Sequence, residues 1–202
     1  MFPNMNKKAD FGIDRTKWRQ HARHRHPRGA SRQWGAIVNG WTYPKNNLGN
    51  FGDDYLYRAL VALSGLAALE PAEATYLTCN TDQDHRGLDG KQRYVLRFPP
   101  GQMPPAKAFW SLTMYDVTPD GRAFFTHNPI SRYAIGDRTE GLQYGTDGSL
   151  EIHLQHERPA EALMANWLPA PAGPMRLVLR AYEPAPSLLE GTYRLPAVRR
   201  VD

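Results

Sequence analysis

Histidine is the side chain most often used as a general base near neutral pH, and three histidines in the second half of the chain are candidates for this role. They are His127, His153 and His156. His153 stands in the run Leu150–Gln155, where hydrophobic and polar residues alternate. Because the side chains of a strand alternate between its two faces, we expect His153 to share a face with Glu151, opposite the core. This pair suits proton transfer in a hydrolase, and it equally suits a solvated sheet face.

A second group of candidates combines aromatic rings with amide and guanidinium groups. Rings stack on planar or sugar-like molecules, and a few converging polar groups orient them. The sequence therefore predicts a pocket for a carbohydrate-like or other small organic ligand, between the sheet that carries Trp110 and the loops that carry Arg132 and Asn166. Structural roles would suit the same residues, because Asn-Pro pairs start turns, Arg132 would pair with a nearby aspartate and Trp167 would close the end of a barrel. The candidates are Trp110, Tyr115, Asn128, Arg132, Tyr133, Asn166 and Trp167.

The motifs of several common enzyme classes are not found in the sequence. It holds no nucleophile elbow, phosphate-binding loop, Cys-x-x-Cys pair or dinucleotide-binding glycine pattern, so we expect no metal and no cofactor. The segment Asp82–Gly90 begins like a calcium loop, but Arg86 and Arg93 stand at two ligand positions, which favours a turn whose aspartates bind their own backbone. The single cysteine, Cys79, is expected in the core because it alternates onto the same face as Leu77.

Basic residues are concentrated at the beginning of the chain. Residues 1–52 hold ten Lys and Arg against two Asp, whereas residues 53–202 carry a net charge of −3. From Arg15 to Arg32 there are seven basic residues and no acidic one, which suits either contact with nucleic-acid phosphates or a solvated leader. No apolar run suits a membrane span or a signal peptide, so we expect a soluble, cytoplasmic protein with no membrane partner.

The elements that must position these candidates are mostly strands. Gly and Pro each occur 17 times in 202 residues, which favours β structure with many turns. The first two strands would form a hairpin through the polar loop 82–90. The predicted strands, each with alternating hydrophobic residues, are Ala74–Asn80, Gln92–Phe98, Ala108–Asp116, Gly121–Thr126, Ser149–Gln155 and Met175–Tyr182.

One amphipathic helix is predicted before these strands, and a short helical turn is predicted at Ala160–Asn166. The helix would open at Asp53 and Asp54 and end near Leu69, before a proline. We therefore expect a basic, partly flexible leader over residues 1–33 and a single domain over residues 34–202, folded as a mainly β, jelly-roll-like antiparallel sandwich with one packed helix. The residues expected on the buried face of that helix are Leu56, Ala59, Leu60, Leu63 and Ala67.

Several blocks of the sequence resemble one bacterial family, in the same order along the chain. They are Gly49–Ala59, Leu88–Gly90 with Tyr94, Pro104 and Pro105, Ala108–Asp116, Asn128–Asp137, Asp147–Leu150, Gln155 and His156, Asn166–Pro171, and Gly173 and Pro174. On these blocks the chain resembles the family called domain of unknown function 1214. The resemblance implies a jelly-roll-like β domain that usually follows a second domain, of unknown function 1254. This chain shows no counterpart of that second domain and would then be a standalone form.

The family has no agreed activity, so the function rests on the residues. We expect a small-molecule or carbohydrate-like ligand-binding domain, or a hydrolase that uses a histidine base. One alternative is a nucleic-acid-binding protein that uses the segment from Arg15 to Arg32. Another is an assembly module without chemistry, in which aromatic strands join copies of the chain as a homo-oligomer.

Overall fold

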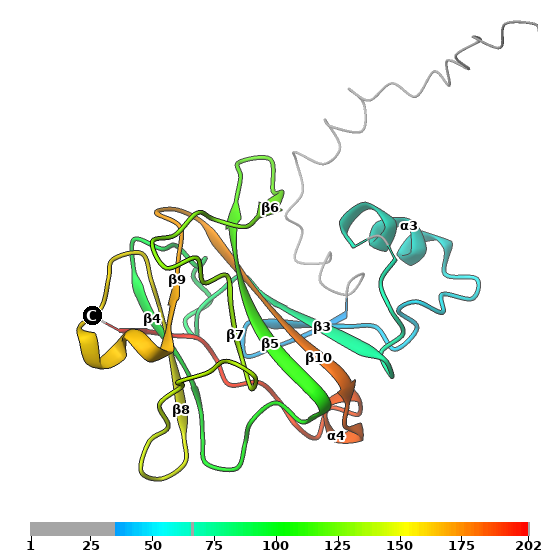
Figure 1. Ribbon diagram of the computed structural model, residues 1–202. Helices are drawn as coiled ribbons and strands as arrows, with labels where there is room; N and C mark the ends of the chain where they lie inside the picture. The colour runs from blue at the N-terminus through cyan, green and yellow to red at the C-terminus, as the bar shows by residue number, and fades with distance from the viewer. Residues whose placement is uncertain (1–34, 66, 202) are drawn as a thin grey trace, which may run out of the picture. The chain divides into compact units, whose positions relative to one another are not determined.

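The computed structural model describes residues 35–65 and 67–201, and strands dominate it (Figure 1). The leader predicted for residues 1–33 lies outside the described residues. None of the helices in the described part of the chain is long and apolar enough to cross a membrane. The elements are β1 (Gly35–Val38), β2 (Trp41–Pro44), α3 (Tyr55–Ser64), β3 (Ala74–Cys79), β4 (Arg93–Phe98), β5 (Ala106–Val117), β6 (Ala123–Phe124), β7 (Ala134–Gly136), β8 (Leu150–Gln155), the 3-10 helix η1 (Glu161–Asn166), β9 (Trp167–Pro169), β10 (Met175–Pro184), α4 (Pro186–Leu189) and β11 (Arg199–Val201).

The larger sheet has the strand order β1-β2-β3-β10-β5-β6, with β7 paired to β5, and its pairs are antiparallel. Its central strand β10 alternates between buried and partly exposed residues, as the sequence predicts for a half-buried strand. Leu177 and Leu179 are fully buried, and Arg176 and Arg180 lie on the opposite face. One face of this sheet therefore forms the core, and the other carries polar and aromatic side chains.

The smaller sheet has the order β11-β4-β8-β9. Its first two pairs are antiparallel, whereas β9 runs parallel to β8. In β8 the side chains of Leu150, Ile152 and Leu154 are fully buried, so Glu151 and His153 share the outer face, as predicted.

The core lies between the inner faces of the two sheets. Phe98 of β4 meets Trp110 of β5 at a ring-centroid distance of 5.5 Å, and both side chains are almost completely buried. Fully burying one large apolar side chain contributes about 1.5–3 kcal/mol, so this two-layer contact is a main source of stability. The predicted class, a mainly β antiparallel sandwich with one packed helix, is confirmed.

The helix α3 is shorter than predicted and buries a different face. The Asp54 carboxylate caps it by accepting a hydrogen bond from the Tyr57 backbone at 3.1 Å, and the helix ends at Ser64 instead of near Leu69. Tyr57 and Val61 are buried against Leu48. Two residues of the predicted buried face, Leu56 and Leu63, are instead 61% and 84% exposed, because the helix meets its neighbours along the Tyr57 side.

The segment 82–90 does not form the predicted hairpin. It connects β3 of the larger sheet to β4 of the smaller sheet, so it crosses from one layer to the other. Asp82 is buried, and its Oδ1 accepts hydrogen bonds from the backbone N–H groups of Asp84 and Arg86, both at 2.9 Å. The predicted turn, in which an aspartate binds its own backbone, is confirmed.

Cys79 has no exposed surface, and its Sγ donates to the backbone carbonyl of Thr81 at 3.2 Å. Burial raises the pKa of the thiol to about 12, so the side chain is an uncharged core residue, as predicted.

Candidate ligand-binding groove

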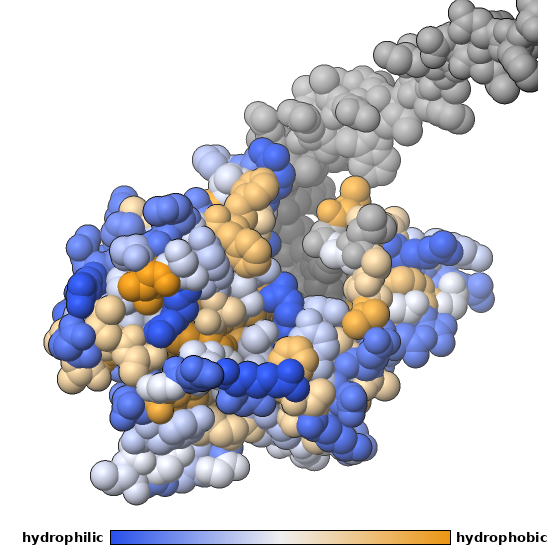
Figure 2. Space-filling view, viewed as in Figure 1, coloured by the Kyte–Doolittle hydropathy of each residue, from blue (hydrophilic) through white to orange (hydrophobic). Residues whose placement is uncertain are grey.

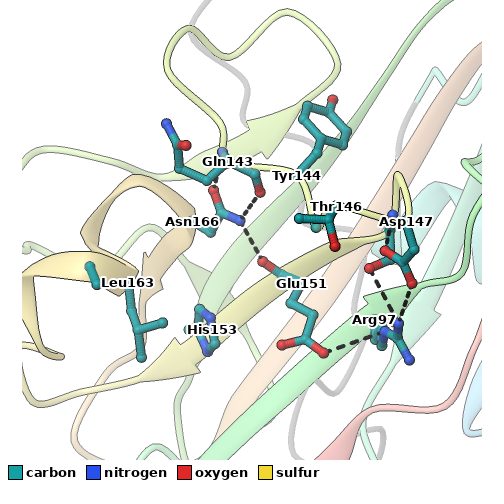
Figure 3. A pocket seen from close by; sticks show the side chains of 12 residues that line it. Arg97, Gln143, Tyr144, Thr146, Asp147, Glu151, His153, Leu163 and Asn166 are labelled. Carbon is teal, nitrogen blue, oxygen red and sulfur yellow. Dashed lines mark hydrogen bonds and ion pairs between the residues drawn. The ribbon is translucent and has the colours of Figure 1, made fainter.

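The outer face of the smaller sheet carries an open, polar groove with a cavity volume of about 400 Å³ (Figure 3). Its base is formed by β4 and β8, one wall by the loop that leads into β8, and the other by η1. Arg97, Tyr144, Asp147, Glu151, His153 and Asn166 are among the residues that line it.

The loop wall is shaped by a tight turn over Gly145-Thr146-Asp147-Gly148. The Gly148 N–H donates to the Gly145 carbonyl at 2.8 Å, and the Gly145 N–H donates to the Ser149 carbonyl at 2.8 Å. Gly148 has a φ of +82°, a conformation that glycine adopts without strain. A Cβ atom at Gly145 would lie 2.7 Å from the Asp147 carboxylate and from the Ser149 hydroxyl, so a larger residue there would displace these two side chains. This turn directs the Asp147 side chain toward β4.

Arg97 of β4 links the two carboxylates of the groove. Its guanidinium lies 3.0 Å from Asp147 and 3.4 Å from Glu151, which is its partner in the β4–β8 register. The hydroxyl of Ser149, followed by its N–H and by the Arg97 charge, lowers the pKa of Asp147. Both carboxylates are therefore oriented toward Arg97, which lies between them, and they can accept hydrogen bonds from a ligand.

His153 follows Glu151 on the same face of β8 and is half-buried in the groove. Burial lowers its pKa, and the negative charge of Glu151 opposes this shift only in part. The imidazole is therefore neutral at pH 7 and presents one donor and one acceptor. No hydrogen bond among the described residues involves either ring nitrogen of His153, so the imidazole is available to a ligand in the groove.

Asn166, at the end of η1, holds the two walls together. Its Oδ1 accepts from the Gln143 N–H at 2.9 Å. Its Nδ2 donates to the carbonyls of Gln143 at 2.7 Å and Glu151 at 2.9 Å. The residue is 7% exposed and its amide is fully hydrogen-bonded, so the role of Asn166 is to fix the η1 wall against the loop wall and β8.

Tyr144 supplies the aromatic surface of the groove. The residue forms an isolated bridge with Leu150 at the start of β8, and its side chain is 52% exposed. Leu163 of η1 adds an apolar contact on the other wall. The sequence analysis did not predict Tyr144, Asp147 or Arg97 as site residues. The Gly-Thr-Asp-Gly segment directly before a strand does, however, indicate a tight turn that would place the Asp147 side chain beside the sheet.

Two of the predicted ligand-binding residues belong to the core instead of the groove. Trp110 is 4% exposed and packs on Phe98. Trp167 is 1% exposed, and its Nε1 donates to the carbonyl of Gln155 at 2.9 Å.

Asn128 and Arg132 have structural roles, because their side chains form hydrogen bonds to backbone groups of the fold. The Asn128 amide accepts from the Arg132 N–H at 2.9 Å and donates to the Arg132 carbonyl at 3.1 Å, which fixes the turn between them. Arg132 Nη1 donates to the carbonyls of Met164, Ala165 and Trp167 at 2.9–3.0 Å. The guanidinium therefore caps the end of η1, and none of the ion pairs of the described residues joins it to an aspartate.

The remaining candidates lie outside the groove. Tyr115 and Tyr133 lie on or beside β5 of the larger sheet, where both contact the ring of Phe125. His127 is exposed in the loop between β6 and β7, and His156 is exposed with its Nδ1 2.9 Å from the Ala170 carbonyl. Of the predicted site residues, the structure thus brings only His153 and Asn166 together in the groove.

The fold and groove define a two-sheet β domain with a polar surface site. The model of a family described as "Protein of unknown function (DUF1214)" matches residues 73–186, more than half of the chain. The chain belongs to this family, as the sequence resemblance predicted.

Two solved structures are similar to this chain. The VPA0106 protein from Vibrio parahaemolyticus is 28% identical, with a TM-score of 0.62, over 79% of this chain and 38% of its own. The chain therefore spans well under half of that relative. A putative uncharacterized protein from Burkholderia cenocepacia is 19% identical, with a TM-score of 0.41, over 67% of this chain and 31% of its own. No protein in the curated comparison matches.

Proposed function

We propose that this protein binds a neutral, carbohydrate-like molecule in the groove on the outer face of the smaller sheet. The observation that carries the proposal is the combination of two oriented carboxylates, a neutral histidine without a partner among the described residues, and an exposed tyrosine ring in one hollow. Sugar hydroxyls both donate and accept hydrogen bonds, and the apolar face of a sugar ring stacks on aromatic side chains. The cavity volume of about 400 Å³ lies within the usual size range of small-molecule sites.

The charge of the groove supports a neutral ligand. The carboxylates of Asp147 and Glu151 outnumber the single guanidinium of Arg97, and His153 adds no charge at pH 7. An anionic sugar would meet net repulsion, whereas a neutral sugar can donate its hydroxyls to the carboxylates. We therefore expect uronic acids and sugar phosphates to bind more weakly than the matching neutral sugars.

The test is a calorimetric titration of the full chain with neutral mono- and disaccharides. Tyr144→Ala should weaken the binding of a sugar about tenfold, since loss of a stacking contact worth about 1 kcal/mol combines with loss of apolar contact area. The melting temperature should not change, because the ring is half exposed.

Tyr55→Ala is the matched control, since this exposed tyrosine lies on α3, outside the groove. Equal effects of the two substitutions, or no binding of any sugar at millimolar concentration, would refute the proposal.

Hydrolysis of the bound molecule is a second candidate function, favoured by the neutral imidazole of His153, which has no hydrogen-bond partner in the described part of the chain. In such a reaction His153 would take a proton from a water molecule that attacks the scissile carbon, and the imidazolium would return this proton to the leaving oxygen as the bond to that oxygen breaks. His153→Gln should then abolish turnover of a chromogenic glycoside or ester and leave binding largely intact. His127→Gln and His156→Gln are matched controls, because both histidines are exposed outside the groove. Full activity of the His153 variant would exclude this role.

A further inference from the structure

The outer face of the larger sheet carries arginines that have no acidic partner among the described residues. On this face Arg180 of β10 lies directly opposite Tyr76 of β3 and Ser111 of β5. Arg176 lies on the same face four residues earlier in β10, opposite Tyr115. The six ion pairs of the described residues all lie elsewhere, and none includes Arg176 or Arg180.

Arg180 is half-buried and is held by neutral hydroxyls. Its Nη1 donates to Thr113 Oγ1 at 2.9 Å, and its Nη2 donates to Tyr115 Oη at 2.8 Å. Thr113 is only 6% exposed, so the guanidinium that binds it lies close against the sheet. A guanidinium is charged at every physiological pH, and partial burial without an anion costs free energy. Because both hydroxyls accept hydrogen bonds from Arg180, each can still donate a hydrogen bond to an acceptor that lies beside the guanidinium.

Arg176 increases the positive potential of this face. Its Nε donates to the Asn80 side chain at 2.8 Å, which is again a neutral partner. Burial lowers the pKa of Arg176, yet the group stays charged at neutral pH. Two cations with neutral partners on one strand favour the approach of an anion.

An aromatic wall stands beside this cationic face. Phe125 stacks on Tyr115 at a centroid distance of 5.2 Å, and Tyr133 meets Phe125 at 5.4 Å. The Phe125 side chain is 62% exposed, and the Arg180 guanidinium lies 5.8 Å from the centre of the Tyr115 ring. Figure 2 shows an apolar surface over β6, the strand that ends next to Phe125. A planar group bound at Arg180 would therefore find a ring surface next to it.

We propose that the outer face of the larger sheet is a second binding site, specific for a planar organic anion whose carboxylate or phosphate binds Arg180. The planar part of the ligand lies against the rings of Tyr115 and Phe125. The site differs from the groove in sheet, charge and ligand class, so the two proposals stand independently.

The experiment is a titration of the full chain with benzoate, phenyl phosphate, inorganic phosphate and the neutral analogue benzamide. Benzoate or phenyl phosphate should bind with millimolar or better affinity, and the stronger of the two identifies the oxyanion. Benzamide should bind at least tenfold more weakly. Binding of the anion should also weaken as salt is added, since part of the attraction is electrostatic.

Arg180→Gln should lower the affinity for the bound anion at least tenfold, whereas Arg200→Gln, on an exposed residue of the other sheet, should not change it. Phe125→Ala tests the ring contact without disturbing a buried residue and should weaken benzoate more than inorganic phosphate. Three results would overturn the proposal. They are equal binding of benzoate and benzamide, anion binding that neither Arg180→Gln nor Phe125→Ala weakens, and no binding of any anion.

Discussion

His153 is the residue whose protonation should control the groove. Burial lowers its pKa below the ordinary histidine value of about 6.5. The folded protein therefore binds fewer protons than the unfolded chain when the pH lies between the two pKa values. Stability is highest above the ordinary value and falls as the pH drops through this window, because protonation of a partly buried imidazole opposes folding.

We predict that sugar affinity falls as the pH drops through the lowered pKa that His153 has in the folded protein, since protonation removes the acceptor nitrogen of the ring. An NMR titration of the His153 ring proton measures its pKa, and calorimetry at several pH values measures the affinity. In His153→Gln the pH step in affinity should vanish. A step that persists in this variant would assign the effect to another group.

Arg132 shows how a residue can stand out in the sequence for a structural reason. Its position beside a tyrosine suggested ligand binding, but its guanidinium binds three backbone carbonyls at the end of η1. The sequence could not reveal these partners, which are more than 30 residues away. The Asn166 amide is a similar case, because its three hydrogen bonds join segments that only the fold brings together.

We predict that Arg132→Ala lowers the free energy of unfolding by about 2 kcal/mol, since hydrogen bonds to a charged group are lost and carbonyls are left unpaired. Denaturant unfolding followed by tryptophan fluorescence measures the change. Arg199→Ala removes an exposed arginine of β11 and should stay within about 0.5 kcal/mol of the wild type. Equal stability of the two variants would show that the η1 cap contributes nothing.

At the scale of elements, the helix α3 shows that the periodicity of hydrophobic residues predicts a helix but not which of its faces is buried. The sequence contains two overlapping apolar stripes, and the more hydrophobic one, through Leu56 and Leu63, was expected to be buried. The structure buries Tyr57 and Val61, whose ring and branched side chain fit against Leu48 and Tyr76. Hydrophobicity alone does not distinguish the stripes, because the choice depends on the shape of the surface that receives the helix.

The contributions of the two stripes of α3 to stability can be compared by substituting one residue of each. We predict that Val61→Ala destabilises the protein by about 1–2 kcal/mol through lost burial, whereas Leu63→Ala changes stability by less than about 0.5 kcal/mol. Thermal unfolding of both variants measures the difference. A larger loss for Leu63→Ala would support the stripe that the sequence favours.

The connection between β3 and β4 was mispredicted for a related reason. A polar loop between two alternating segments suits a hairpin within one sheet, and it suits a crossing between two sheets equally well. Local turn chemistry was predictable, since Asp82 does bind its own backbone. The pairing partners were not, because β4 pairs with strands from much later in the chain, β8 and β11.

At the scale of the whole molecule, the mainly β class followed from long alternating strands such as those around Leu112 and Leu179. The strands that escaped prediction, β1, β2, β7, β9 and β11, hold three or four residues each, too few to show a period of two. The groove escaped prediction in part because its lining comes from β4, the loop before β8, β8 itself and η1.

The two sheets also divide the predicted site residues between them. Of the predicted residues, His153 and Asn166 line the groove on the smaller sheet, and Tyr115 lies beside Arg180 on the outer face of the larger sheet. Nucleic-acid binding through the segment from Arg15 to Arg32 lies outside the described residues and stays a prediction. The groove and the outer face are therefore the two surfaces on which ligand binding can be tested residue by residue.

The central claim, that the groove binds a neutral sugar, is tested most directly by mapping backbone amide shifts in NMR spectra during a sugar titration. We predict that the perturbed amides cluster in residues 143–153 and 162–167, which surround the groove. The amides of β3 and β10 should stay unchanged. Perturbations confined to the larger sheet, or a spectrum that no sugar changes, would contradict the account.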